Sequence, residues 1–133
     1  MKKITERVKA NEILISDGAW GTFLQQKGLQ PGECPELWNI THRDEVLSIA
    51  QSYVDAGSNM IETNSFGGNS FKLKHFGLSN RAYEINKAAA EISRQAAGKD
   101  VYVLKKSNEG LKIYPLDEYI NCCWNTLHVT TSN

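Results

Sequence analysis

Two polar side chains follow directly after short apolar runs of the sequence. Asp17 follows Ile13-Leu14-Ile15-Ser16, and Asn64 follows Met60-Ile61-Glu62-Thr63. A carboxylate at the end of a strand can hold an ammonium group, and an amide there can donate and accept hydrogen bonds at once. Gly18 lies beside Asp17, and a glycine lets a ligand approach the backbone closely. These residue types predict a binding site for a small polar molecule.

Other interpretations of the same residues stay open. Asp17 can instead cap the following helix, and Asn64 can start a turn. The pair Gly67-Gly68 could cradle a phosphate, although it lacks the spacing of either glycine-rich nucleotide fingerprint. A phosphate-binding enzyme is therefore a third hypothesis, and it requires these glycines to precede the N-terminus of a helix.

The remaining residues with chemical potential favour no second site. We expect His42 and His75 on the surface and assign no context to His128, while Trp20 and Trp38 are typical packing residues. Cys34 has no basic partner close in sequence, so it is not expected to be a nucleophile.

The adjacent pair Cys122-Cys123 provides only two of the three or four ligands that a zinc site needs, and Cys34 and His128 are the remaining candidates. We predict no metal ligands in this chain.

Alternating elements must position these residues. Compact apolar runs predict strands over residues 12–17, 60–64 and 101–104, because buried parallel strands are continuously apolar. Apolar residues at helical spacing predict helices between the strands. This order is typical of an α/β fold with parallel strands and right-handed crossovers. The helices are expected over residues 4–10, 19–27, 42–56, 71–76 and from about 81 to 97, with Thr41 and Asn80 as N-caps and a loop over residues 29–39.

Composition limits the class of protein. The chain has 133 residues, enough for one domain, and 15 basic residues balance 15 acidic ones. A neutral charge argues against nucleic acid as a partner. No apolar run reaches the ~18–20 residues of a transmembrane helix, and the charged N-terminus has no signal-peptide segment, so we predict no membrane association and a cytoplasmic location. Three cysteines, two of them adjacent, favour reduced thiols over a disulfide framework.

Three sequence blocks resemble the homocysteine S-methyltransferase family, which includes the homocysteine-binding domain of cobalamin-dependent methionine synthase. The blocks are Asp17-Gly18-Ala19-Trp20-Gly21-Thr22, Pro35-Glu36-Leu37-Trp38-Asn39 and the long segment from Tyr53 to Gly68. The resemblance extends from about Glu12 to Val103. Several motifs in the right order make chance a poor explanation.

The resemblance implies a fold and a reaction. The family fold is a (β/α)8 barrel with its site at the C-terminal ends of the strands. In that site Asp17 would help hold the amino group of homocysteine, and Gly18 and Asn64 would line the mouth. In the family, zinc held by three cysteines binds the homocysteine sulfur as a thiolate, which takes a methyl group from a corrinoid, a sulfonium or a betaine.

The chain departs from the family pattern in its length and its C-terminal part. A barrel needs about 250 residues, so this chain supplies roughly the first three βα units, a partial (β/α)8 TIM barrel. Residues 1–104 form the predicted N-terminal portion of the barrel. The family's glycine-rich loop after the third strand is replaced by Leu104-Lys105-Lys106-Ser107-Asn108-Glu109-Gly110. Here we expect a turn followed by a strand over residues 111–114, and we leave the later residues unassigned.

Residues 105–133 therefore form a divergent tail, which suggests a truncated or frame-shifted product. Cys122-Cys123 is similar to the family's terminal Gly-Gly-Cys-Cys-Gly, but Asn121 and Trp124 replace the glycines. The zinc ligands are not carried over.

Two functions are predicted for such a chain. One is an incomplete homocysteine methyltransferase domain, whose open sheet edges would favour self-association. The alternative is a non-catalytic α/β module that binds a partner, with the tail as a cover for the sheet.

Overall fold

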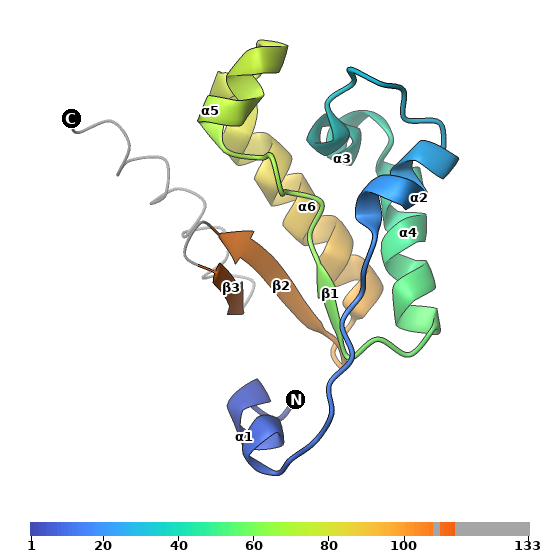
Figure 1. Cartoon of the computed structure of the whole chain (residues 1–133), viewed down its shortest axis with the longest axis vertical. Helices are drawn as coiled ribbons and strands as arrows, with labels where there is room; N and C mark the ends of the chain where they lie inside the picture. The colour runs from blue at the N-terminus through green and yellow to red at the C-terminus, as the bar shows by residue number, and fades with distance from the viewer. Residues whose placement is uncertain (108–109, 114–133) are drawn as a thin grey trace, which may run out of the picture.

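The computed structural model describes residues 1–107 and 110–113, which form a small sheet with helices packed against it (Figure 1). The order of elements alternates between helical and extended segments, as the sequence predicts. The elements are α1 (Ile4–Lys9), α2 (Trp20–Gln26), the 3-10 turn η1 (Pro35–Leu37), α3 (Trp38–Thr41), α4 (Arg43–Asp55), β1 (Met60–Glu62), α5 (Ser70–Leu73), η2 (Lys74–Phe76), η3 (Ser79–Arg81), α6 (Ala82–Ala97), β2 (Tyr102–Ser107) and β3 (Gly110–Ile113).

Parallel pairing joins the first three extended segments. β1 and β2 are parallel, with Met60 opposite Tyr102 and Glu62 opposite Leu104. Ser16 adds an isolated parallel bridge to Met60. The α/β prediction with parallel strands is confirmed for this part of the chain, and α4 and α6 are the crossover helices between the segments.

Helices α4 and α6 build the core with the sheet. Ile61 and Val103 are buried and share a cluster with Ala50 of α4 and Ala96 of α6. These alanines allow the helices to approach the strands closely. A second buried cluster connects α2, α3, α4 and α6, and it consists of Leu24, Leu29, Trp38, Val46, Ile49 and Ile92, with Trp20 packed against both clusters. The expectation that the two tryptophans are packing residues agrees with this arrangement.

The prediction of a buried strand over residues 12–17 is wrong. Ile13 is 89% exposed and Ile15 is 60% exposed, and the pairing is limited to the single bridge at Ser16. The segment pairs with β1 on one side only. The Asn59 and Met60 amides donate to the Ile15 carbonyl, and the Asp17 amide donates to the Met60 carbonyl. Among the described residues nothing covers the face of the segment that carries Ile13 and Ile15, whereas Leu14 on the opposite face is half-buried.

The hairpin after β2 also changes the expected pattern. β3 pairs antiparallel with β2, with Leu104 opposite Ile113 and Ser107 opposite Gly110. The turn predicted over residues 105–110 is shorter than expected, because β2 continues to Ser107. The strand predicted after this turn is present as β3. Only two residues separate the strands, and a parallel pairing needs a crossover of about a dozen residues or more, so the return must be antiparallel.

Helix ends are predicted better than helix starts. Gly57, Gly77 and Gly98 have φ values of 94°, 68° and 58°, which explains why helical segments end before them. Thr41 is not the N-cap of α4, because it lies inside α3, and Asn80 is not the N-cap of α6, because it lies inside η3. The loop expected over residues 29–39 contains η1 and the start of α3. Short 3-10 segments carry little periodicity, and the sequence patterns therefore missed them.

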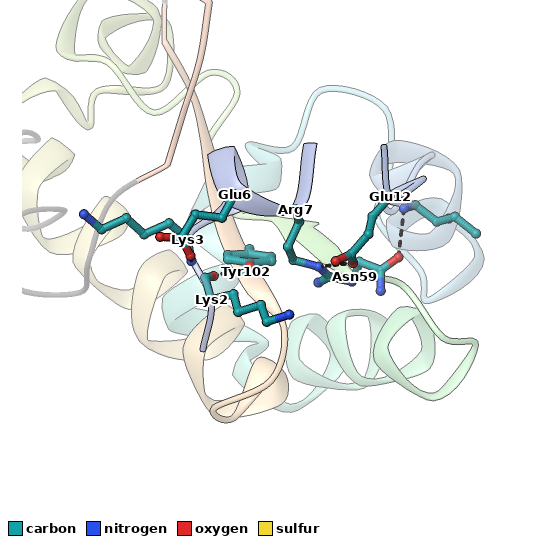
Figure 2. A network of polar contacts seen from close by, with 8 residues as sticks. Lys2, Lys3, Glu6, Arg7, Glu12, Asn59 and Tyr102 are labelled. Atoms are coloured by element: carbon teal, nitrogen blue, oxygen red, sulfur yellow. Dashed lines mark hydrogen bonds and ion pairs between the residues drawn. The ribbon is translucent and has the colours of Figure 1, made fainter. Parts of the chain in front are cut away.

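Polar contacts fasten α1 near the N-terminal end of β2 (Figure 2). The Tyr102 hydroxyl donates a hydrogen bond to the Lys2 carbonyl, and the Arg7 guanidinium lies 5.8 Å from the centre of the Tyr102 ring. Arg7 also pairs with Glu12 at 2.6 Å. These bonds hold α1 even though none of its residues is buried. Within residues 1–107 and 110–113, no helix has the length and apolar character needed to cross a bilayer.

Candidate functional site

Asp17 and Asn64 follow neighbouring parallel segments, so both lie at the C-terminal end of the sheet. The Asp17 amide donates to the Met60 carbonyl at 3.0 Å, directly after the Ser16 bridge. Asn64 comes two residues after β1 ends at Glu62. Loops at this edge of a parallel sheet commonly form ligand sites.

The Asp17 carboxylate is held in a fixed orientation. Its Oδ2 atom accepts hydrogen bonds from the Trp20 indole Nε1 at 2.7 Å and from the Glu62 backbone amide at 2.8 Å. Its Oδ1 atom accepts the Ser16 hydroxyl at 3.1 Å. The sequence-based alternative of a helix cap is wrong, because the N-cap of α2 is Ala19 and no side chain caps that helix. The carboxylate instead connects residues 13–16, which we call the edge segment, with α2 and β1.

Gly18 and Tyr53 lie beside this carboxylate. Gly18 is exposed, and a Cβ atom added to it would meet the Tyr53 hydroxyl at 3.8 Å, which is an ordinary contact. Burial raises the pKa of the Tyr53 phenol, and the negative charge of Asp17 raises it further. The phenol therefore stays protonated at neutral pH and lies near the Asp17 carboxylate.

Asn64 is buried and its amide is used within the protein. Its Nδ2 atom donates to the Pro35 carbonyl at 2.9 Å and to Asn39 Oδ1 at 3.0 Å. Asn39 in turn donates to the Asn64 carbonyl at 2.8 Å. The structure thus places Asn64 at the expected end of the sheet, with its amide nitrogen directed to η1 and α3. The turn that follows is closed one residue later, by the bond from the Gly68 amide to the Ser65 carbonyl.

Three further polar residues belong to this region and were missed from the sequence as site residues. Glu36, Asn39 and Asn86 are each buried, and each bonds to the loop after β1. The motif Pro35-Glu36-Leu37-Trp38-Asn39 supported the family resemblance, yet it gave no role to its polar members. The adjacent glycines Gly67 and Gly68 were the available signal in the sequence. Glycines allow other side chains to approach the backbone closely, and here Glu36 and Asn86 do so.

Cys34, His42 and His75 each contact a neighbouring side chain of the fold. The Cys34 thiol is buried and donates to Glu36 Oε2 at 3.5 Å. Burial raises the pKa of this thiol, and the charge of Glu36 acts in the same direction, so the thiolate is disfavoured. His42 stacks on Trp38 with ring centres 4.0 Å apart, and His75 contacts Phe71 edge to face.

The described residues contain no group of three or more His, Cys, Asp or Glu that could hold a metal ion. Cys122, Cys123 and His128 lie outside the described residues. Gly67-Gly68 precedes α5, but that helix has four residues, and the Asn69 side chain already accepts its Lys72 amide. The phosphate hypothesis therefore gains no support from this geometry.

Comparison with known proteins adds the decisive observation. Residues 14–114 match the sequence profile of the family described as homocysteine S-methyltransferase. The chain belongs to the homocysteine S-methyltransferase family. The match includes Asp17, the loop before α3 and all three strands.

Curated relatives in this family are much longer than the chain. Methionine synthase of Mycobacterium tuberculosis is 29% identical over 118 residues, which is 80% of this chain and 10% of that protein. Betaine–homocysteine S-methyltransferase 1 of Danio rerio is 30% identical over 97 residues, 71% of this chain and 24% of that protein. The protein of the same name from Pongo abelii is 32% identical and is covered to 25%. The chain thus spans a tenth to a quarter of these relatives.

A solved structure of this kind has a similar fold. The metallated form of the homocysteine methyltransferase MmuM from Escherichia coli superposes with a TM-score of 0.62 at 18% identity. The superposition covers 86% of this chain and 43% of that chain. At 18% identity, this similarity supports the fold of the chain and says nothing about its chemistry.

Proposed function

We propose that this chain binds the amino-acid end of homocysteine, with the Asp17 carboxylate as the acceptor for the ammonium group. The observation that supports this most is the fixed carboxylate at the C-terminal end of a parallel sheet in a homocysteine S-methyltransferase family member. Charge-assisted hydrogen bonds between an ammonium group and a carboxylate are about twice as strong as neutral ones.

The geometry around Asp17 favours one direction of approach. Trp20 and the Glu62 amide occupy Oδ2, whereas Oδ1 receives the Ser16 hydroxyl among the described residues. Gly18 adds no side chain on the exposed side. An ammonium group can therefore approach Oδ1, and the carboxylate does not have to reorganise to receive it.

The family resemblance implies methyl transfer to a zinc-bound thiolate, and the described residues do not fit that metal. Among residues 1–107 and 110–113, no metal-binding group is present, and the Cys34 thiol is buried and held by Glu36. We therefore assign no step at zinc to these residues. Their proposed part is to bind and orient the amino acid. Zinc and a methyl donor such as a corrinoid would be held by other residues.

We further propose that residues 1–104 are the N-terminal portion of a (β/α)8 barrel and that residues 105–133 are a separate tail. The coverage of 43% of the MmuM chain is compatible with part of such a barrel. Homocysteine as a small-molecule substrate and a cytoplasmic location remain predictions of the same hypothesis.

Isothermal titration of the 133-residue chain with L-homocysteine, with and without zinc, tests the binding role. We expect saturable heat from the wild type and none from Asp17→Asn, which keeps the size of the side chain and removes its charge. Asp55→Asn is a matched control, because Asp55 is exposed near the end of α4, where it accepts a hydrogen bond from the Gln51 side chain. Equal heats from the wild type and Asp17→Asn would exclude Asp17 from the site.

A second candidate function is a non-catalytic module that binds a partner. The antiparallel β3 favours it, because β3 occupies the edge of β2 where a parallel barrel would place its next strand. A cooperative thermal transition and a monomeric mass, together with no homocysteine heat, would support this candidate. Aggregation and sensitivity to protease would support an incomplete barrel.

A further inference from the structure

Buried polar side chains hold the loop that follows β1. We call residues 63–68 the mouth loop, since it starts next to the Glu62 amide that binds Asp17. Backbone groups of this loop bond to side chains from three other elements of the fold. Glu36 and Asn39 come from η1 and α3, and Asn86 comes from α6.

Glu36 makes one of the two shortest of these contacts. Its Oε1 atom accepts the Gly67 amide at 2.6 Å, and its Oε2 atom accepts the Cys34 thiol at 3.5 Å. Glu36 is only 6% exposed. A buried carboxylate is costly unless donors compensate it, and a charged acceptor forms a stronger bond to a backbone amide than a neutral one. The bond to Gly67 is therefore a strong restraint on the loop.

The two glycines of the loop fit closely against their partners. A Cβ atom added to Gly67 would lie 2.8 Å from Glu36 Oε1, and one added to Gly68 would lie 2.8 Å from Asn86 Oδ1. Asn86 also donates to the Gly68 carbonyl at 2.6 Å. Neither glycine has a positive φ, so the space taken by the partner explains the glycine better than backbone strain does.

We propose that Glu36 is a positioning residue for the homocysteine site, acting through Gly67 on the mouth loop beside Asp17. This inference rests on the proposed function. Without Glu36, the Gly67 amide loses its buried acceptor, and the loop gains freedom at the edge where the ligand binds. The bound geometry is then populated only part of the time, and the apparent affinity falls by that fraction.

Hydrogen exchange and titration calorimetry on the 133-residue chain test the proposal together. In Glu36→Ala we expect amide exchange in the mouth loop to accelerate, and homocysteine affinity to fall, each by about tenfold, the size expected for loss of a buried hydrogen bond to a charged group. Glu36→Gln keeps an acceptor for Gly67 and should stay within about threefold of the wild type. Glu33→Ala is the control, because Glu33 is an exposed carboxylate just before η1 that accepts a hydrogen bond from the Gln30 backbone amide.

A double-mutant cycle tests the direct contact between Glu36 and Gly67. Gly67→Ala should weaken binding in the wild type, since its methyl group meets Glu36. In the Glu36→Ala background the same substitution should have little further effect, because the obstructing atom is gone. Additive effects of the two substitutions would contradict a direct contact between Glu36 and Gly67.

The outcomes separate this proposal from the proposed function. Faster exchange in Glu36→Ala with unchanged homocysteine affinity would overturn the positioning role while homocysteine binding stands. Unchanged exchange would overturn the restraint itself. No heat from the wild type with homocysteine would overturn the proposed function, and the positioning role with it, even if exchange in the mouth loop responded to Glu36.

Discussion

The Asp17 carboxylate accepts a hydrogen bond of 2.8 Å from the backbone amide of Glu62, which lies 45 residues further along the chain. This bond joins the edge segment to the last residue of β1. It makes Asp17 a structural link as well as the candidate ligand for an ammonium group. The effect of an Asp17 substitution on homocysteine binding therefore has to be measured separately from its effect on the stability of the fold.

Two substitutions at Asp17 should differ in stability. Asp17→Ala leaves the Trp20 indole and the Glu62 amide without their acceptor and should lower the free energy of unfolding by about 2 kcal/mol. Asp17→Asn keeps an acceptor oxygen and should lose about half as much. Urea unfolding followed by circular dichroism measures both. Equal losses in the two variants would show that the charge, rather than the acceptor, stabilises the fold.

The Asn39–Asn64 pair should be more important for stability than for ligand contact. Asn39→Ala removes the donor to the Asn64 carbonyl and the acceptor for the Asn64 amide, both buried. We expect a loss of about 2 to 3 kcal/mol in the free energy of unfolding. Asn80→Ala, at an exposed position in η3, serves as the control and should change stability by less than about 0.5 kcal/mol. A loss of similar size in both variants would contradict the role of the buried pair.

Elements with strong periodicity could be predicted from the sequence. The apolar stripe of α6 and the runs around β1 and β2 gave the alternation, and Gly57, Gly77 and Gly98 gave the helix ends. These signals are local, and each coincides with the packing of the final fold. The exposure of Ile13 and Ile15 could not be predicted in the same way, because it depends on whether other elements cover this segment.

The site was predicted only in outline. Asp17 and Asn64 could be placed at one end of the sheet, because parallel strands end at the same edge. The partners of Asn64 and the role of Glu36 depend on contacts across 25 and 31 residues of sequence, and no spacing rule reports such contacts. Whether Asp17, Gly18 and Asn64 bind substrate stays a prediction.

Alkaline pH should weaken the fold through Cys34. Its folded-state pKa is raised, mainly by burial, so folding favours the protonated thiol. The unfolded chain ionises near the ordinary thiol pKa of about 8.5, whereas the folded chain ionises at higher pH. The contribution to stability is therefore complete below about pH 8.5 and decreases as pH rises toward the folded-state pKa. Urea midpoints measured from pH 7 to 10 under reducing conditions should fall across the upper part of this range.

The Cys34→Ala variant should show a smaller decrease above pH 8.5, since it lacks the thiol. Some decrease should remain toward pH 10 and above, because the pKa of Tyr53 is raised in the same direction. Alkylation by iodoacetamide, mapped by mass spectrometry, gives an independent measurement of the thiol. Cys34 should react more slowly than an exposed thiol at pH 8. Rapid alkylation of the folded chain would contradict the burial of this side chain.

The exposed edge formed by residues 13–16 should support self-association. Ile15 and Asp17 direct backbone groups to Asn59 and Met60, so the backbone groups of Leu14 and Ser16 face away from the sheet. The segment Ile13-Leu14-Ile15-Ser16 has no charge and no proline, which are the usual protections of an edge strand. We expect sedimentation velocity to show a mass that rises with concentration, and Ile13→Lys combined with Ile15→Lys to return the protein to monomer.

Val8→Lys is the matched control, because Val8 is an apolar side chain 59% exposed on α1, outside the edge. If association depends on general hydrophobicity, Val8→Lys should reduce it as well, and the edge would lose its special role. Association that survives lysine at both Ile13 and Ile15 would show that another surface carries the contact. Association that responds only to the edge variants would mean that a second strand can pair with this segment.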